Sequence, residues 1–363
     1  AVLRRQEGIM TYQAFAARAE HRESLERLWT QAMSDRRIAL VRDRRWSWLY
    51  ERNPAGPAYT YVVQHVESGQ IVGSASVYPR DIVVGGQSYK AGVLADFVTH
   101  KAHRVAGPAV MVQRAIMEEH RQRGLDFLFG YPNKGAAPIF PRLRFKTVCE
   151  SSLWVKPLRT ARKLSLFLHP ALAIGLAPFA NAVLATNDLR LMVSRRPMGA
   201  AVMGHVPDQA FDDLWERCRG QVPIFGVRTS AFLRWRYIEH TTERYKVFTV
   251  QRRDGGRVYG YVIFSIRENR VYVADMLAEG GVRGAESLLL AFCRAMRRRG
   301  HESVCINYAG DERFFASLRA LQFLRRVGAR KLIAFVAQDQ PEALRNLVYD
   351  HSGWFMHDGE LDI

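Results

Sequence analysis

The chain has 363 residues, of which 48% are hydrophobic and 24% are charged. This composition is typical of a globular protein with packed cores, and the length predicts two domains of ordinary size. The formal net charge is +18, carried by 45 arginines and only eight lysines. This excess indicates either a compositional bias of the genome or an anionic partner. The sequence has no dense basic run with interleaved aromatic residues, which argues against nucleic acid as a partner.

The cysteines predict a reduced protein without a zinc or redox motif. Cys149, Cys218, Cys293 and Cys305 are far apart in the sequence, and no pair has C-x-x-C spacing. Structural disulfides are rare in the reducing cytoplasm, so we expect a cytoplasmic protein. We also expect no metal cofactor.

The first half predicts an α-helix, then several strands, then helices and strands in alternation. Residues 24–33, "SLERLWTQAM", have the apolar spacing of an amphipathic helix. Gly85 and Gly86 predict a turn in a hairpin over 81–98. A long helix is predicted from Pro108, since proline is well tolerated at the first helical position. Further strands are predicted at 60–66, 70–78, 125–131 and 145–155, and a short helix near 134–143.

An apolar segment separates the two halves. Residues 164–185 form a run of 22 residues without a formal charge, and the basic stretch "KPLRTARK" at 156–163 precedes it. The length would suffice to span a bilayer, but Pro170 and Pro178 weaken a spanning helix. We expect a helical linker packed against the domains. The first alternative is a segment on an anionic membrane surface, which implies a peripheral location at the inner face of the membrane.

The second half predicts a similar series of elements. Strands are predicted at 246–252, 257–266, 270–277, 303–309 and 331–337, and a helix at 285–300. Together with the first half, this pattern indicates an α+β protein with mixed sheets.

The two halves also repeat individual residues at matched spacing. The matching pairs are Leu28-Trp29 with Leu214-Trp215, Trp48-x-Tyr50 with Trp235-x-Tyr237, Gly73 with Gly260, Asp96 with Asp275, and Arg144-Phe145 with Gln322-Phe323. The second tryptophan precedes the glycine by 25 residues in both halves. Such a repeat indicates a duplicated domain. We therefore predict domains at 10–155 and 196–363, joined by an apolar linker at 156–195 that contains the apolar segment.

Three stretches of the first half resemble the GNAT acyltransferase superfamily. They are the strand "LADFV", the loop Arg104-Val-Ala-Gly107-Pro-Ala109 that opens a helix, and "NKGAAPIFPRLRF" after the next strand. The last is similar to the N-x-x-A…G-F element of the family, with Arg144 where glycine usually stands. The resemblance is clearer over 12–150 than over 200–337. It implies two tandem GNAT-like domains, each a mixed twisted sheet flanked by helices.

The resemblance also implies acetyl-CoA or another acyl-CoA as a co-substrate. In the family the R-x-x-G-x-A loop holds the pyrophosphate, and a helix N-terminus with unpaired N–H groups suits that role. The alternative is a simple tight turn. In the second half Glu286 stands where Gly107 would be, so we predict CoA binding in the first half alone. The predicted CoA-binding residues are Phe97, Val98, Thr99, Arg104, Val105, Ala106, Gly107, Ala109, Asn133 and Phe140.

Acyl transfer to an amine needs a proton acceptor and a donor for developing negative charge. The resemblance places a carboxylate base on the strand before the loop, which here is Asp96. Tyr131 ends the next strand and is the predicted donor to the carbonyl or the thiolate. Each also has a structural alternative, Asp96 as a loop or helix partner and Tyr131 as a packed aromatic residue. The usual tyrosine acid of the family is replaced by Phe140.

The sequence thus predicts a CoA-dependent N-acyltransferase, with acetyl as the favoured acyl group. The acceptor is an amine, with sugars and lipid-linked molecules among the candidates. One alternative is an aminoacyl-tRNA-dependent transferase of the peptidoglycan-bridge type, which the net charge of +18 favours. Another is a non-catalytic acyl-CoA-binding protein, which Phe140 favours.

Overall fold

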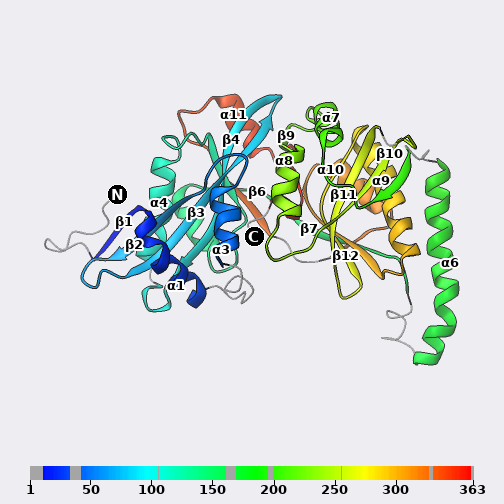
Figure 1. Ribbon diagram of the computed structural model, residues 1–363, viewed down its shortest axis with the longest axis horizontal. Coiled ribbons are helices and arrows are strands. Elements are labelled where there is room, and N and C mark those ends of the chain that lie inside the picture. The colour runs from blue at the N-terminus through cyan, green and yellow to red at the C-terminus, as the bar shows by residue number, and fades with distance from the viewer. Residues whose placement is uncertain are drawn as a thin grey trace.

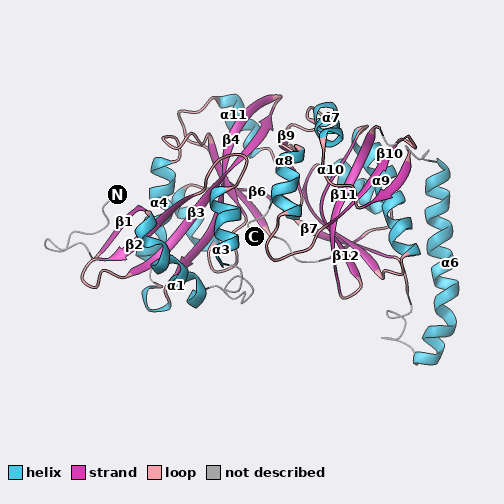
Figure 2. Ribbon diagram, viewed as in Figure 1, coloured by secondary structure: helices cyan, strands magenta, loops and turns pink. Residues whose placement is uncertain are grey.

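Two sheets of eight strands each lie side by side in the computed structural model, with helices against their faces (Figure 1, Figure 2). The structure describes residues 11–32, 42–104, 106–160, 169–194, 199–254, 256–326 and 330–360. The predicted CoA-binding residue Val105 and residues 164–168 of the apolar segment therefore lie outside the described residues. The predicted fold, two tandem GNAT-like α+β domains with mixed sheets, is confirmed.

The first sheet has the strand order β1-β2-β3-β4-β5-β15-β6, and β9 pairs with β3. Strands β4 and β5 are parallel, and the other neighbours are antiparallel. The bounds are β1 Tyr12–Ala16, β2 Tyr59–His65, β3 Ile71–Val84, β4 Gln87–Thr99, β5 Phe127–Gly130, β6 Lys146–Glu150, β9 Ile224–Gly226 and β15 Lys331–Phe335.

The second sheet has the order β14-β7-β13-β12-β11-β10-β8, and β16 pairs with β13. Strands β12 and β13 are its parallel pair. The bounds are β7 Ser152–Pro157, β8 Ala200–Met203, β10 Lys246–Gln251, β11 Val258–Arg267, β12 Arg270–Ala278, β13 Ser303–Gly310, β14 Leu324–Arg326 and β16 Phe355–Met356.

Helices cover both sheets, and two of them occupy equivalent places. Helix α4 packs on β1 to β3, and α9 packs on β11 and β12. Helix α4 begins at Ala106, two residues before the predicted start at Pro108. The bounds are α1 Arg22–Ala32, α3 Arg42–Trp46, α4 Ala106–Glu119, α6 Pro170–Ser194, α7 Gln209–Cys218, α8 Ser230–Leu233, α9 Gly281–Arg298, α10 Glu312–Ala320 and α11 Glu342–Tyr349.

The two halves exchange strands, which the sequence did not predict. The segment 145–155, predicted as one strand, forms β6 in the first sheet and the start of β7 in the second. Strand β15, predicted within the second half, lies between β5 and β6 in the first sheet. Where the two crossing segments meet, the backbone N–H of Ser151 donates to the carbonyl of Arg330 at 2.9 Å. Apolar patterning predicts a strand but not its distant partner. The domain boundaries at 155 and 196, which rest on the sequence repeat, remain a prediction.

Residues 170–185 of the apolar segment lie in the long helix α6, at the outer edge of the second half (Figure 1). Two ion pairs attach its C-terminal part to the second half. Asp188 accepts from Lys156 at 2.6 Å and from Arg297 at 2.5 Å. Within the described residues, no helix is both long enough and apolar enough to cross a membrane.

A reciprocal tryptophan pair joins the two halves. Trp48 and Trp235 lie in matching helical turns, Ser47–Glu51 and Arg234–Ile238. The indole N–H of Trp48 donates to the carbonyl of Trp235 at 2.5 Å, and that of Trp235 donates to the carbonyl of Trp48 at 2.7 Å. The rings stack at 5.5 Å, and both residues are buried. The recurring tryptophan therefore forms the contact between the repeats.

Replacing Trp48 by phenylalanine tests this contact. The change removes one indole donor and leaves the carbonyl of Trp235 unpaired in the interior, which costs about 1–3 kcal/mol in addition to lost packing. Trp154→Phe is the matched control, because the buried indole N–H of Trp154 has no hydrogen-bond partner among the described residues. Chemical denaturation should show a lower free energy of unfolding for Trp48→Phe than for Trp154→Phe. Equal losses would mean that the reciprocal hydrogen bonds contribute nothing.

Candidate functional site

The parallel strands β4 and β5 diverge near their C-terminal ends. They pair only over Ala91–Val93 and Phe127–Phe129. Beyond Val93, the edge of β4 that faces β5 has no strand partner among the described residues. Unpaired backbone groups at such an edge can bond to an extended ligand.

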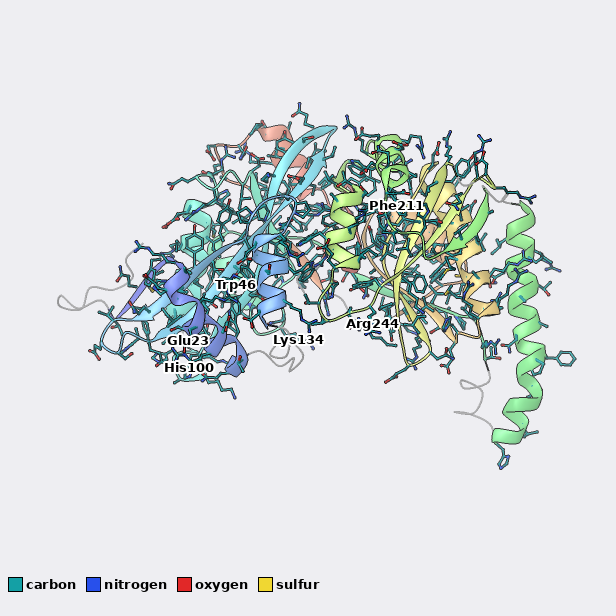
Figure 3. The ribbon with its side chains drawn as sticks, in the orientation of Figure 1. Glu23, Trp46, His100, Lys134, Phe211 and Arg244 are labelled. Carbon is teal, nitrogen blue, oxygen red and sulfur yellow. The ribbon has the colours of Figure 1, made fainter. Side chains whose placement is uncertain are left out.

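The loop after β4 leads into the N-terminus of α4. A short turn, Lys101–His103, precedes Arg104, which is exposed, and Val105 lies outside the described residues. Figure 3 labels His100, at the start of this loop, on the outer side of the first half. The first N–H groups of a 14-residue helix such as α4 have no partner within the helix and carry partial positive charge. The loop therefore has the geometry of an anion site.

The fold does not require a glycine at position 107. Gly107 is exposed, its φ is not in the left-handed region, and a Cβ added there would meet no atom within 4 Å. In the second half, a Cβ on Gly284 near the start of α9 would lie 1.8 Å from the carbonyl oxygen of Glu279. Gly284 is therefore required by local packing, whereas Gly107 is exposed and leaves open space at the first turn of α4.

The other predicted CoA-binding residues lie on β4 or beyond β5. Val98 and Thr99 are half-buried and pair with β3. Phe97 contacts the buried Phe140, with ring centroids 6.3 Å apart. Ala109 is buried in the first turns of α4. Ala106 begins that helix.

Asn133 forms the turn after β5. Its Oδ1 accepts from the backbone N–H groups of Gly135 and Ala136, both at 3.0 Å. This turn leads into the short helix Ala137–Leu143, which ends at Arg144 with a φ of 63°. Gln322, its counterpart in the second half, has a φ of 64°. Asn133 thus has a structural role, and its contact with CoA remains a prediction.

Asp96 is buried, and both oxygens of its carboxylate accept hydrogen bonds from neighbouring side chains. Its carboxylate accepts two hydrogen bonds from Arg45, at 2.7 and 3.0 Å, and one from the hydroxyl of Tyr50. Asp96 also has a φ of 45° next to an irregular point in the pairing of β3 with β4. These contacts match the structural alternative, and the role of Asp96 as a base remains a prediction.

The second half repeats this buried pair. Asp275 accepts from Arg228 at 3.0 Å and from the hydroxyl of Tyr261 at 3.0 Å. Burial raises the pKa of Asp275. Both aspartates of the repeat therefore pair with an arginine and a tyrosine in the interior.

The C-terminal segment reaches the junction of the two halves through Glu360. Its carboxylate binds Arg80 of β3 at 2.8 and 2.9 Å and lies 3.2 Å from Arg228. Burial alone would raise the pKa of Glu360, but the arginines lower it to about 2. The carboxylate thus stays charged and holds residues from both halves together.

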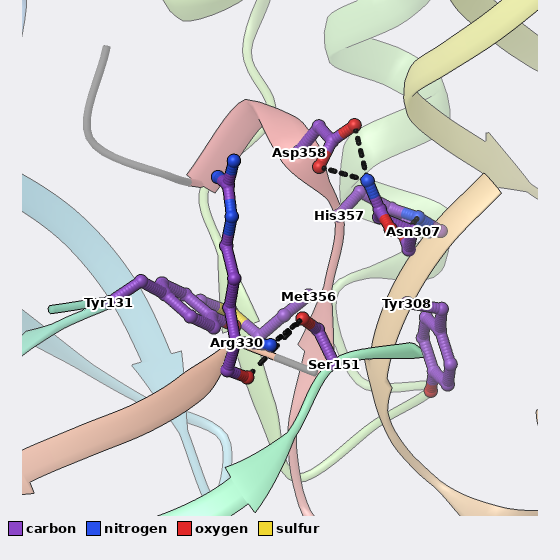
Figure 4. A pocket seen from close by; sticks show the side chains of 8 residues that line it. All are labelled: Tyr131, Ser151, Asn307, Tyr308, Arg330, Met356, His357 and Asp358. Carbon is purple, nitrogen blue, oxygen red and sulfur yellow. Dashed lines mark hydrogen bonds between the residues drawn. The ribbon is translucent and has the colours of Figure 1, made fainter. Parts of the chain in front are cut away.

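A small polar pocket of about 40 Å³ lies at this junction (Figure 4). Its walls come from both halves and from the C-terminal segment. They are formed by Tyr131, Ser151, Asn307, Tyr308, Arg330, Met356, His357 and Asp358. Figure 4 shows Tyr131 on one side of Arg330, with Asn307 and Asp358 on the other.

The ionisable groups of this pocket have shifted pKa values. Burial raises the pKa of Asp358, whose oxygens accept from the side-chain amide of Asn307 at 2.9 and 3.0 Å. Burial also raises the pKa of Tyr131 well above its ordinary value. Burial lowers the pKa of His357 to about 3, so this ring is neutral at physiological pH.

Among these groups, sequence reasoning found only Tyr131. Asp358 and Asn307 lie 51 positions apart in the chain, outside the repeated landmarks and the loop motif. Their side chains meet because β16 pairs with the end of β13. In the part of the chain that the structure describes, no group of three or more His, Cys, Asp or Glu side chains could hold a metal ion.

A known protein family matches part of the first half. The family model of the acetyltransferase (GNAT) domain matches residues 16–145. No curated protein matched the sequence.

Solved structures share the fold over most of the chain at low sequence identity. A probable N-acyltransferase of unknown function from Enterococcus faecalis has a TM-score of 0.64 at 11% identity, over 90% of this chain and 72% of that one. A GCN5-related N-acetyltransferase from Anabaena variabilis has a TM-score of 0.61 at 14% identity, over the same shares. The N-myristoyltransferase of Saccharomyces cerevisiae with bound myristoyl-CoA has a TM-score of 0.56 at 11% identity, over 96% of this chain and 90% of that one.

These likenesses concern the fold, and the family match concerns the first half, where β4, the loop and α4 lie. Residues 16–145 therefore match the acetyltransferase (GNAT) family, and the chain as a whole has the fold of two tandem GNAT-like domains.

Proposed function

We propose that the protein is an acyl-CoA-dependent N-acyltransferase whose first half binds CoA. The observation that carries the proposal is Gly107, a glycine that the fold does not need, at the exposed N-terminus of α4. A backbone without a side chain lets phosphate oxygens approach the free N–H groups, and Arg104 adds a charge-assisted contact. The match to an acetyltransferase domain favours acetyl-CoA as the donor.

The thioester would lie along the unpaired edge of β4, beyond Val93. Phe97 and Phe140 form an apolar wall there, and Phe140 cannot donate a proton. Tyr131 follows the last residue of β5, and its raised pKa keeps the hydroxyl protonated. We assign it the role of donor to the departing thiolate.

The amine acceptor would enter through the junction pocket. As its nitrogen attacks the thioester carbonyl, the new C–N bond replaces the C–S bond, the nitrogen loses a proton and the thiolate gains one. Asp358 is the first candidate for the proton acceptor, because its pKa is raised and its oxygens accept hydrogen bonds only from a side-chain amide among the described residues. Asp96 remains the second candidate. Its two oxygens would first have to leave Arg45.

Gly107→Glu tests the phosphate loop. A ligand that binds only the folded state adds about 2.7 kcal/mol at a hundredfold excess over its dissociation constant. CoA should therefore raise the melting temperature of the parent protein. The substitution should preserve the melting temperature without CoA, since the new side chain has open space and an acidic residue suits a helix N-terminus. It should abolish the rise with CoA.

Gly220→Glu is the matched control for this experiment. Gly220 is also exposed, and a Cβ there would also meet no atom within 4 Å. This variant should respond to CoA like the parent protein. A full rise in the melting temperature of Gly107→Glu with CoA would refute the loop as the CoA site. If CoA raises the melting temperature of the parent protein but no amine is acylated, the result favours a non-catalytic acyl-CoA-binding protein.

Asp358→Asn tests the base. The carboxylate must be deprotonated to accept a proton, so the parent rate should fall as pH drops through the raised pKa of Asp358. The variant should lose roughly 10²-fold in turnover, the usual scale for a lost general base. It should also lose this acidic limb of the pH–rate profile, while CoA still raises its melting temperature.

Asp96→Asn provides the comparison. It leaves Arg45 buried without its charged partner, which should cost about 3–5 kcal/mol of stability. If Asp96 is structural, this variant loses stability but keeps the acidic limb of the profile. Loss of that limb in Asp96→Asn, together with a normal profile in Asp358→Asn, would assign the base to Asp96 instead.

We also propose that α6 lies on an anionic membrane surface. Leu172, Leu176 and Phe179 are 60%, 50% and 79% exposed, and their spacing puts them on one face of the helix. The sequence before the helix, at 156–163, has four basic residues, of which Lys156 is buried against Asp188, and the whole chain carries +18. Exposed apolar side chains on a strongly basic protein suit an interfacial helix.

Vesicle flotation tests this proposal. The parent protein should float with vesicles that contain phosphatidylglycerol at low salt, and salt should weaken the electrostatic part of the binding. The double variant Leu176→Glu/Phe179→Glu should not float. Val206→Glu/Leu324→Glu is the control, since these residues are 52% and 49% exposed outside α6. If the parent protein stays with the unbound fraction at low salt, α6 is only a packed linker.

A further inference from the structure

The second half contains an apolar cavity at the position that matches the divergence of β4 and β5. Strands β12 and β13 pair only over Arg270–Val273 and Ser303–Ile306, and then separate. The cavity lies between their C-terminal ends and the first turn of α9. Strand β16, which pairs with the end of β13, supplies one of its walls.

The cavity has a volume of about 160 Å³. Its walls include Phe225, Met276, Leu277, Ala285, Tyr308 and Phe355. An apolar cavity of about 150 Å³ can hold a benzene molecule. The hydroxyl of Tyr308 is buried and lies beside the backbone of Asp311. The interior therefore fits a single ring or a branched aliphatic group.

The mouth of the cavity is polar, with one acidic and one basic residue, Asp311 and Arg313, beside a helix N-terminus. Gly281 and Val282, the first residues of the 18-residue helix α9, line it. Their N–H groups belong to the first turn and have no partner within the helix. Arg313 also lines the mouth, with its Nε bound to Asp311 at 2.8 Å. A carboxylate can bind the helix N-terminus here.

A pyrophosphate is a poorer fit at this mouth than a carboxylate. Strand β12 is followed after only Glu279 and Gly280 by α9, and Gly284 packs directly against the carbonyl of Glu279. The side chain of Glu286, one turn further along α9, is buried. The second half thus keeps the diverging strands but has a tight connection in place of the open loop at Gly107.

We infer that this cavity binds a small monocarboxylate with an aromatic or branched aliphatic body. The apolar body fills the space next to Tyr308 and Phe355, and the carboxylate binds at the N-terminus of α9 beside Arg313. This site is separate from the CoA site of the first half and does not depend on the proposed transferase activity.

Calorimetric titration of the full chain with 3-phenylpropanoate, at saturating CoA, tests the inference. For a ligand of this size we expect a dissociation constant in the millimolar range or tighter. The neutral analogue 3-phenylpropan-1-ol should bind several-fold more weakly, because it lacks the carboxylate, and propanoate should not bind detectably, because it lacks the ring. Arg313→Ala should weaken binding of the acid but not of the alcohol.

Replacing each of two alanines on α9 by leucine completes the experiment. Ala285→Leu fills the cavity and should abolish binding of the acid, while the CoA-induced rise in melting temperature stays intact and shows that the variant is folded. Ala291→Leu, on the same helix but outside the cavity lining, is the control and should bind like the parent protein. The inference is overturned if the parent protein does not bind 3-phenylpropanoate, or if Ala285→Leu binds it unchanged. Neither result would affect the CoA site, which the melting curves test separately.

Discussion

The exchange of strands between the two halves fixes the rest of the architecture. Strand β15 completes the first sheet between β5 and β6, and β7 completes the second sheet between β13 and β14. Neither sheet is continuous without a strand from the opposite repeat. The crossing segments meet at Ser151 and Arg330, and both residues line the junction pocket. The same crossing that joins the sheets therefore forms the walls of the proposed acceptor site.

Several buried polar contacts hold this junction in one arrangement. The reciprocal hydrogen bonds of Trp48 and Trp235 join equivalent turns of the two repeats. Glu360 binds Arg80 from the first sheet and lies beside Arg228 from the second half. Leaving a buried charge or a buried hydrogen-bonding group without its partner costs free energy, so these contacts oppose a shift of one half against the other. Such rigidity suits a reaction in which a thioester on one element must meet an amine held by others.

The two repeats share a fold but differ at the turn from strand to helix. In the first half a longer loop leaves Gly107 exposed at the start of α4, with open space beside it. In the second half the connection is short, and Gly284 is needed for close packing against Glu279. We propose that the N-terminus of α4 binds a large anion, a pyrophosphate, and that the N-terminus of α9 binds a small anion above an apolar cavity. On this proposal the two repeats carry two distinct ligand sites.

Local patterns in the sequence predicted the features that depend on near neighbours. The Gly85-Gly86 turn, the helix after β4, the tandem fold and the strands follow from periodicity, turn residues and matched spacing, except for the short strands β1, β8, β9, β14 and β16, which were not predicted. The exchange of β7 and β15 depends on pairing across more than a hundred residues, which alternation does not encode. For the same reason the sequence did not predict a site role for Asp358, whose partner Asn307 is distant in the chain. The pairing of Asp96 with Arg45, which precedes it by 51 residues, was not predicted either.

Amide hydrogen exchange with and without CoA tests the central claim most directly, because it reports on both repeats of the unmodified protein at once. Binding at the N-terminus of α4 should slow exchange in peptides that cover residues 99–109, since their N–H groups would bond to phosphate oxygens. Peptides that cover residues 279–286 should exchange at the same rate in both conditions. Unchanged exchange at 99–109 under saturating CoA, or protection confined to 279–286, would contradict the assignment of CoA to the first half.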